Sequence, residues 1–285
     1  MSNHSDMLIH WFPGHMTKSL REIEASLRLA DIVLYVLDAR APFSCINPAF
    51  DALVQHKPVI YVLNKADLAP EQAVTAWKAR LSGADRSVVA LSGTASGSAK
   101  KILPLIQKSA SAKIEKYRAK GINAALRGMV IGVPNSGKST LINNFCGNAK
   151  TVTGNKPGVT RGKQWVRVNE YFELLDTPGT LYPKLSDQTV ARRLAYIGSV
   201  KDEVVDSFAL ACAFIEDVGQ IAPDALKARY GTESGADVRL TLEQIAQSRG
   251  FLNRGGEPDT GRAAAAVLDD FRKGRLGKIC LDSQV

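Results

Sequence analysis

The sequence predicts an α/β protein in which a doubly wound sheet is followed by a small all-helical C-terminal domain. Through residue 183, short apolar runs alternate with helix-compatible segments, as strands and crossover helices do in a parallel sheet. After that point, helix-compatible segments follow one another with no strand-like run between them. The expected domains are therefore residues 1–183 and 184–285.

Each element of the first domain is predicted from its local pattern. The runs at 31–38 and 58–63 are apolar almost throughout, which is typical of strands covered on both faces. Leu20, Ile23 and Leu27 recur at helical spacing. The expected strands are 31–38, 58–63, 87–91, 128–133 and a hairpin of 164–169 with 171–175, and the expected helices are 16–30, 71–81, 100–120 and 138–145.

The C-terminal domain is expected to hold about five helices, over 187–198, 201–214, 223–230, 241–249 and 261–273. No apolar run of the chain approaches the roughly 20 residues that span a bilayer. The polar start of the chain shows no signal or transit pattern. The four cysteines are far apart and form no Cys-x-x-Cys pair, which indicates reduced thiols in a cytoplasmic protein. We expect a monomer without a membrane partner.

The net charge of +9 is concentrated in the first domain. Residues 184–285 hold 14 basic and 15 acidic residues, whereas residues 1–183 hold 23 basic and 13 acidic ones. The stretch 100–165 is the extreme, with 13 Lys or Arg and one acid, Glu115. A basic face favours a polyanionic partner through phosphate contacts, although a merely solvated surface would carry the same charges.

The segment Gly132–Thr140 has the Gly-x4-Gly-Lys-Ser pattern of a phosphate-binding loop. It lies between an expected strand and an expected helix, which is the context such a loop requires. Backbone N–H groups should face the phosphates, Lys138 should reach the β- and γ-phosphates, and Ser139 should place its hydroxyl on Mg²⁺. A chance glycine turn is the alternative. The nucleotide-binding residues expected here are Asn135, Ser136, Gly137, Lys138, Ser139 and Thr140.

A second motif, Asn64-Lys65-x-Asp67, stands at the end of an expected strand. The Asp67 carboxylate can accept hydrogen bonds from the N1–H and 2-amino groups of guanine. Adenine lacks both donors and would leave a buried charge unpaired, so Asp67 selects guanine. Ser92-Gly93 follows the next strand and is either a backbone contact to the guanine oxygen or an ordinary turn.

Two further segments would complete a GTP site. Asp176 ends a strand, so it can hold Mg²⁺ through water while the Gly179 N–H meets the γ-phosphate; a simple turn is the alternative. Thr160 is the candidate second hydroxyl ligand of Mg²⁺, ordered only with the γ-phosphate present, or else a loop residue without a role. The glutamine that orients the attacking water in small GTPases is missing, since Thr180 and Leu181 follow Gly179. Either another group positions the water, or hydrolysis is very slow until a partner completes the site.

The order of these motifs is rotated. An ordinary small GTPase carries the phosphate-binding loop before the guanine-reading motif, but here Asn64 precedes Gly132. The sequence therefore predicts a circularly permuted P-loop GTPase sheet. As a consequence, the segment after Gly179 leads directly into the helical domain.

Over nearly the whole chain, the sequence resembles the RbgA/YlqF family of circularly permuted GTPases, which act in assembly of the large ribosomal subunit. The motifs that carry the resemblance are WFPGHM at 11–16, DARAP at 38–42, NKAD at 64–67, GVPNSGKST at 132–140, PGVTR at 157–161, DTPG at 176–179 and DFRKGRLGK at 270–278.

The resemblance implies GTP hydrolysis stimulated by the ribosomal subunit, a C-terminal domain that contacts rRNA, and a cytoplasmic bacterial protein. It implies a catalytic role for His15 when the subunit is bound, with a structural or rRNA-contacting role as the alternative. For Asn135 it implies contact with a K⁺ ion near the phosphates, with an ordinary loop asparagine as the alternative. Leu181 matches a hydrophobic residue that the family has in place of the usual glutamine. A last basic cluster, Arg272, Lys273, Arg275 and Lys278, suits phosphates but is more often solvated.

The sequence therefore predicts a GTP-hydrolysing assembly factor that binds GTP or GDP with Mg²⁺, and whose partners are the precursor of the large ribosomal subunit and its rRNA. Three other hypotheses stay open. They are a non-catalytic, GTP-sensing RNA-binding scaffold, a P-loop ATPase or kinase acting on a small molecule, and a regulator whose target is a protein.

Overall fold

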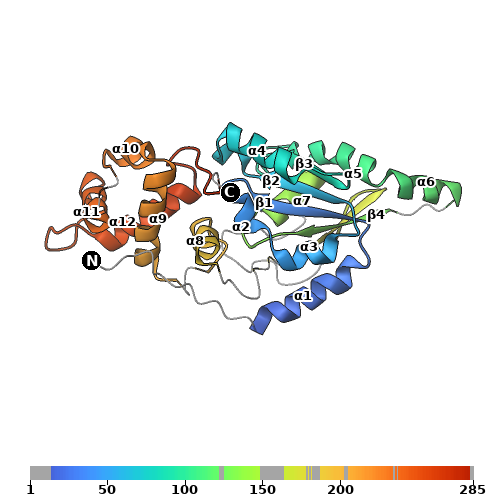
Figure 1. Cartoon of the computed structure of the whole chain (residues 1–285), viewed down its shortest axis with the longest axis horizontal. Coiled ribbons are helices and arrows are strands. Elements are labelled where there is room, and N and C mark those ends of the chain that lie inside the picture. Colours follow the sequence, from blue (N-terminus) through green and yellow to red (C-terminus); the bar gives the residue numbers. More distant parts are fainter. Residues whose placement is uncertain are drawn as a thin grey trace. The chain divides into compact units, whose positions relative to one another are not determined.

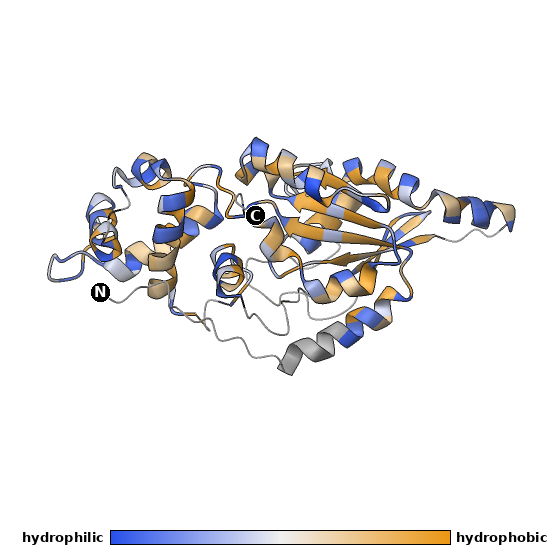
Figure 2. Ribbon diagram, in the orientation of Figure 1, coloured by the Kyte–Doolittle hydropathy of each residue, from blue (hydrophilic) through white to orange (hydrophobic). Residues whose placement is uncertain are grey.

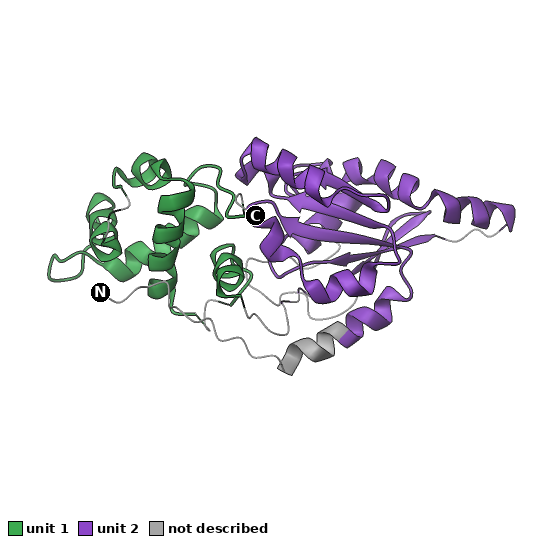
Figure 3. Cartoon of the chain, viewed as in Figure 1, with its two compact units in different colours: residues 1–11, 185–285 green, residues 12–184 purple. Residues whose placement is uncertain are grey.

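The computed structural model describes residues 14–121, 125–147, 164–177, 179, 181, 187–201, 205–233, 235 and 237–282, with the side chains of 14–20 and 164 outside the description. The chain separates into two compact units (Figure 3). Residues 12–184, drawn in purple, form the unit called first below, and the unit that contains residues 185–285, drawn in green, is called second. Each unit is described by itself below.

The first unit is built on a six-stranded sheet in the order β3-β2-β1-β4-β6-β5 (Figure 1). All neighbouring strands are parallel except β5, which pairs antiparallel with β6. The central strand β1 is aligned so that Val33 lies opposite Val59 on one side and Met129 on the other. The strands are β1 Ile32–Asp38, β2 Val59–Asn64, β3 Arg86–Ala90, β4 Leu126–Ile131, β5 Gln164–Asn169 and β6 Phe172–Asp176.

Helices cover both faces of this sheet, which is why β1 and β2 are buried at every residue. Figure 2 shows these central strands as the most hydrophobic part of the unit. On one face, α5 and α7 pack against the apolar side chains of β1, β2 and β4. On the other, Phe50 of α3 packs edge-on against Tyr35. The helices are α1 Gly14–Leu27, α2 Pro42–Cys45, α3 Pro48–Val54, α4 Glu71–Leu81, α5 Leu103–Ser109, α6 Ser111–Ala119 and α7 Lys138–Cys146.

The structure corrects two expectations for this unit. The single helix expected over 100–120 is instead a 3₁₀ turn, Ser98–Ile102, followed by α5 and α6. Pro104, in the first turn of α5, cannot donate a backbone hydrogen bond and so favours a new helix start. At Ala110 the backbone leaves helical geometry before α6 begins. The short helices α2 and α3 were not expected, and each also starts with a proline in its first turn.

The second unit is helical, with α8 Gln188–Tyr196, α9 Ser207–Ile221, α10 Asp224–Tyr230, α11 Val238–Ser248 and α12 Thr260–Arg272. Its described residues contain no strand, as expected, and only an isolated bridge joins Leu252 to Pro258. The ring of Phe214 contacts the rings of Tyr196 and Phe271 at 5.1 and 4.8 Å between centroids.

The helix expected over 201–214 begins later than predicted. Asp206 caps α9 by accepting hydrogen bonds from the N–H groups of Phe208 and Ala209, so the helix starts at Ser207. Within the described residues, no helix has the length and apolarity needed to cross a membrane.

Candidate nucleotide-binding site

The loop that joins β4 to α7 has a backbone that only glycine fits at two positions. Gly132 has a φ of 150°, and an added Cβ would lie 2.3 Å from the carbonyl oxygen of Val36. Gly137 has a φ of 95°, and its Cβ would lie 2.2 Å from Nδ2 of Asn64. The glycines therefore allow the loop to close tightly against the ends of its neighbouring strands. This is the predicted phosphate-binding loop.

Lys138, the first residue of α7, is buried beneath this loop. Its ammonium donates hydrogen bonds to the carbonyl oxygens of Gly132 at 3.1 Å and Val133 at 2.9 Å. Burial lowers the pKa of Lys138 to about 8, against the opposing charge of Asp176. A cation held this way is positioned for the phosphates of a nucleotide, which would replace the lost hydration.

The two predicted Mg²⁺ ligands of the loop and of β6 lie together. The Ser139 hydroxyl donates to Oδ2 of Asp176 at 2.9 Å. Burial raises the pKa of Asp176, while the hydrogen bond from Ser139 and the charge of Lys138 oppose this. Its other oxygen, Oδ1, is buried without a hydrogen-bond partner among the described residues. One hydroxyl and one carboxylate with a spare oxygen are a donor set that fits Mg²⁺, which prefers oxygen ligands.

The backbone at Gly179 lies against the phosphate-binding loop. A Cβ on Gly179 would lie 2.6 Å from Cα of Pro134 and 2.9 Å from Nζ of Lys138. Its N–H is therefore near the lysine predicted to reach the γ-phosphate. Leu181 is fully buried. The family resemblance matches this residue to the position of the usual glutamine.

Asn64 joins three loops that are far apart in sequence. Its Nδ2 donates to the carbonyl oxygen of Ser136 at 2.8 Å. Its Oδ1 accepts from the N–H of Gly93 at 2.7 Å and from the N–H of Lys65 at 2.9 Å. Because Asn64 is buried, these bonds fix the guanine-reading motif, the Ser92-Gly93 turn and the phosphate-binding loop in one arrangement.

Lys65 adds a second connection. It has a left-handed backbone, with a φ of 57°, and its Nζ donates to the carbonyl oxygen of Asn135 at 2.7 Å. Asp67 lies in the 3₁₀ turn Ala66–Leu68 with its side chain exposed. A carboxylate in that position is accessible to a base held beside the loop.

A buried ion pair supports Lys65 and carries no role in the sequence-based prediction. Asp38, at the end of β1, pairs with Arg40 through contacts of 2.9 Å to Nε and 2.8 Å to Nη2. Lys65 also contacts Asp38, at 2.9 Å. Burial alone would raise the pKa of Asp38, but the charges of Arg40 and Lys65 hold it well below its usual range. The signals in the sequence are a charged pair directly after an apolar strand and the DARAP motif at 38–42, which carries the family resemblance without an assigned role.

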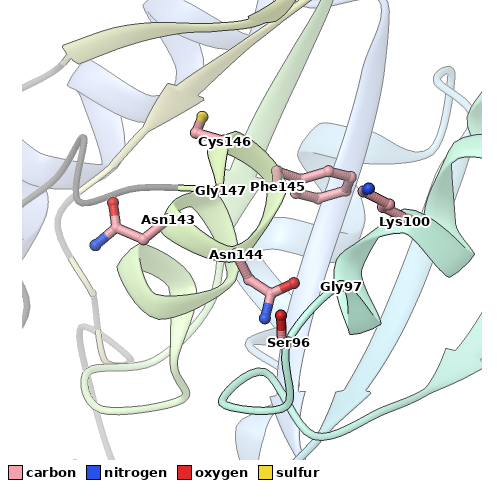
Figure 4. Close-up of a pocket in the computed structure, with 8 residues that line it drawn as sticks. All are labelled: Ser96, Gly97, Lys100, Asn143, Asn144, Phe145, Cys146 and Gly147. Carbon is pink, nitrogen blue, oxygen red and sulfur yellow. The ribbon is translucent and has the colours of Figure 1, made fainter.

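Asn144 of α7 is a second residue that the sequence did not indicate. Its Nδ2 donates to the carbonyl oxygens of Gly93 at 3.1 Å and Ala95 at 2.6 Å, and its Oδ1 accepts from the N–H of Ala99 at 3.1 Å. It thereby ties the Ser92-Gly93 turn to the helix that follows the phosphate-binding loop. Figure 4 shows Asn144 at the side of an open pocket of about 520 Å³ beside this turn.

Several predicted residues lie outside this geometry. Thr160 and Thr180 are outside the described residues. His15 lies in α1, but its side chain is not described. The structure thus brings together Asn64, Lys65, Gly93, the loop 132–140, Asp176 and Gly179. Asp67 and Ser92 lie in described turns that follow β2 and β3.

Comparisons with known proteins agree with this arrangement. A family model described as 50S ribosome-binding GTPase matches residues 127–229. Ribosome biogenesis GTPase A of Bacillus cereus is 38% identical over 97% of this chain and 94% of its own length. Mitochondrial ribosome-associated GTPase 1 of Mus musculus is 32% identical, covering 96% of this chain and 90% of its own.

Among solved structures, GNP-bound YlqF from T. maritima is 27% identical, with a TM-score of 0.65, over 93% of this chain and 97% of that one. This likeness confirms the predicted fold class, a P-loop GTPase sheet followed by helices. Along the chain, β2, which ends at Asn64, comes before β4, which leads to Gly132, and in the sheet β1 lies between them.

Proposed function

The chain belongs to the ribosome biogenesis GTPase A family, and from this premise we propose that it is a GTP-hydrolysing assembly factor for the large ribosomal subunit. The observation that carries the nucleotide part is Asn64, which joins the guanine-reading motif to the phosphate-binding loop by hydrogen bonds of 2.7–2.9 Å. A base read by Asp67 and phosphates held at Lys138 would then belong to one bound GTP.

Several residues of the chain would have separate roles in GTP binding and hydrolysis. Lys138 and the loop N–H groups hold the phosphates, and Asp67 selects guanine. Ser139 and Asp176, with Thr160 as a further hydroxyl, would hold Mg²⁺, which supplies neutralisation of the developing phosphate charge. Asn135 would contact a K⁺ ion near the same phosphates.

We propose that hydrolysis is slow in the free protein and is stimulated by the ribosomal particle. Leu181 is buried and apolar, so it cannot orient the attacking water as a glutamine would. His15 is the candidate to do so when the subunit is bound, since an imidazole can orient water or accept its proton near neutral pH.

Two features support the ribosomal partner: the charge of one stretch of the chain, and the direct continuation of the segment after Gly179 into the helical unit. The stretch 100–165 carries 13 basic residues and one acid, which favours rRNA as a binding partner. The segment after Gly179 continues into the helical unit, so ordering of this segment by GTP would be transmitted along the chain to that unit. We expect a cytoplasmic monomer whose residues 184–285 act as a separate rRNA-contacting domain.

The test is GTP hydrolysis in K⁺ and in Na⁺ buffer, alone and with purified large ribosomal subunits, using the wild type and His15→Ala. Small subunits serve as the control particle. The proposal expects strong stimulation by large subunits only, greater in K⁺, and its loss in His15→Ala with subunit binding retained. Stimulation that survives in His15→Ala removes the role of His15. Absence of stimulation by any ribosomal particle contradicts the proposed function.

A non-catalytic GTP-sensing scaffold is the second candidate, favoured by the buried Leu181. It predicts that GTP, GDP and the empty state differ in subunit binding while turnover stays at the basal rate with subunits present. An assembly factor driven by hydrolysis predicts both a nucleotide-dependent affinity and accelerated turnover, so the same samples separate the two.

A further inference from the structure

A pocket at the opposite ends of the strands from the nucleotide loops has no role in the function described so far. It has a volume of about 600 Å³, within the range of roughly 300–1,000 Å³ that is typical of ligand sites. Leu126 and Phe172, the first residues of β4 and β6, contribute to its lining. Parallel strands carry their nucleotide loops at the carboxyl ends, so this pocket is separate from the GTP site.

The lining combines apolar walls with aromatic rings and planar polar groups. Leu103, Ile106 and Ile114 line it together with Tyr117 and Tyr171. Gln107, Arg118 and Asn169 also line it and are exposed. Tyr171 is 61% exposed, so much of its ring is accessible to a ligand. Such a lining suits a flat, partly polar group that stacks on an aromatic ring and has hydrogen-bonding edges.

The helix beside the pocket, α6, is basic and lies at the edge of the core, against which its Ile114 packs. All residues of α6 are described and none is buried, and Figure 1 shows the helix projecting from the end of the sheet. Lys113 pairs with Asp31, whereas Lys116, Arg118 and Lys120 are exposed. The acids nearby are Glu115 on α6 and Glu170, which accepts a hydrogen bond from the Tyr171 hydroxyl.

We infer that this pocket binds an unpaired base of single-stranded RNA, which stacks on Tyr171 while its flanking phosphates contact α6. Positive charge beside an apolar pocket with aromatic rings favours a ligand that carries both phosphates and flat bases. A splayed-out base is available in single-stranded loops and bulges of RNA but not inside a duplex. The inference deepens the proposed function by specifying an rRNA contact, but its test requires neither GTP hydrolysis nor a ribosomal particle.

The test uses the full-length protein with a fluorescein-labelled 12-nucleotide RNA, either single-stranded or in a duplex, and fluorescence anisotropy. Tyr171→Ala should weaken binding of the single strand on the order of 10- to 100-fold and leave duplex binding unchanged. Tyr171→Phe keeps the ring and should bind within about twofold of the wild type. Lys116→Gln should weaken both RNAs alike and reduce the salt dependence.

Trp165→Ala is the matched control, because Trp165 is an exposed aromatic residue of the same hairpin that does not line the pocket. It should leave both affinities unchanged. Equal binding by Tyr171→Ala and the wild type, equal losses in Tyr171→Ala and Tyr171→Phe, or no RNA binding by the wild type would each overturn the inference. So would a loss by Tyr171→Ala of binding to large subunits but not to RNA, since a protein would then occupy the pocket. Stimulation of GTP hydrolysis by large subunits would leave the proposed function standing in each case.

Discussion

The ammonium of Lys65 lies 2.9 Å from Oδ2 of Asp38, a carboxylate that is 0% exposed and also pairs with Arg40. Lys65 belongs to the guanine-reading motif and contacts the phosphate-binding loop at Asn135. The ion pair at the end of β1 therefore supports a residue of the nucleotide site without lying in any nucleotide motif. It links the stability of the sheet to the geometry of the site.

We expect Asp38→Asn to lower the free energy of unfolding by about 3 kcal/mol, because it leaves the buried Arg40 without a counter-charge. Urea unfolding measures this. The matched control is Glu233→Gln, which removes the exposed pair with Lys227 and should cause no measurable change. Equal stability of the two variants would show that the Asp38 pair contributes little.

The same ion pair predicts that the stability of the folded protein depends on pH in the acid range. The pKa of Asp38 is lowered in the folded protein from its ordinary value of 3.8, so its contribution to stability is complete above about pH 4 and is lost as the pH falls below that. The wild type should therefore lose more stability than Asp38→Asn in this acid range. Parallel acid dependence in the two proteins would contradict the assignment.

Asp67→Asn should reverse base selection. An asparagine side chain cannot accept both guanine donors, and it offers an N–H to the 2-oxo group of xanthine instead. We expect GTP affinity to fall by at least about 100-fold and XTP affinity to rise, as measured by competition with a fluorescent nucleotide. Glu71→Gln, at an exposed acid on α4, should bind GTP like the wild type. Unchanged preference in Asp67→Asn would remove this residue from the base site.

Asn144→Ala should loosen the Ser92-Gly93 turn, because it removes three hydrogen bonds from one side chain. We expect a loss of GDP affinity of about tenfold while ATP stays excluded through Asp67. Calorimetry measures the affinity. The control is Cys146→Ala, which changes another residue that lines the pocket beside Asn144 and should leave the GDP affinity unaltered. An equal effect of both substitutions would point to the pocket rather than the hydrogen bonds.

Nucleotide binding should take up a proton above pH 8. The pKa of Lys138 is about 8 in the free protein, and bound phosphates would restore its charge, so affinity should fall by up to about tenfold per pH unit as the pH rises past 8. Titration calorimetry at pH 8.5 in two buffers of different ionisation enthalpy measures the uptake, with pH 6.5 as the control. Identical heats in both buffers at pH 8.5 would contradict it.

The low pKa also affects the nucleotide-free protein. Since the unfolded chain holds its Lys138 proton up to about 10.5, it binds more protons than the folded one between pH 8 and 10.5. The contribution of Lys138 to the free energy of unfolding should therefore rise as the pH increases from 8 to 10.5.

The sequence by itself determined the strands, most helices and the position of the loop between β4 and α7. These depend on local patterns: β1 is apolar throughout because both its faces are covered, and α4 spans Glu71–Leu81 as its periodicity predicts. The phosphate-binding loop is likewise a local motif whose glycines permit its backbone. Helix boundaries were less accurate, since the break at Ala110 and the cap at Asp206 depend on single residues.

The basic cluster near the C-terminus shows what sequence proximity cannot decide. Arg272 donates to the carbonyl oxygens of Tyr196 and Ala195, at the end of α8. Arg275 pairs with Asp270, which also accepts from Arg229 and the Tyr230 hydroxyl. Arg272 and Arg275 are therefore engaged in hydrogen bonds and ion pairs within the helical unit, so the cluster is weak evidence for an RNA-binding surface.

Only the tertiary structure decided which distant residues meet. Asp38 meets Lys65, Asn64 meets Gly93 and Ser136, Asn144 meets Ala95, and Tyr117 and Tyr171 line one pocket. The physical reason is that helix and strand formation follows from neighbouring residues, whereas these contacts depend on the order and register of the strands and on how helices pack on them. Those are set by burial over the whole sheet, which a local pattern does not contain.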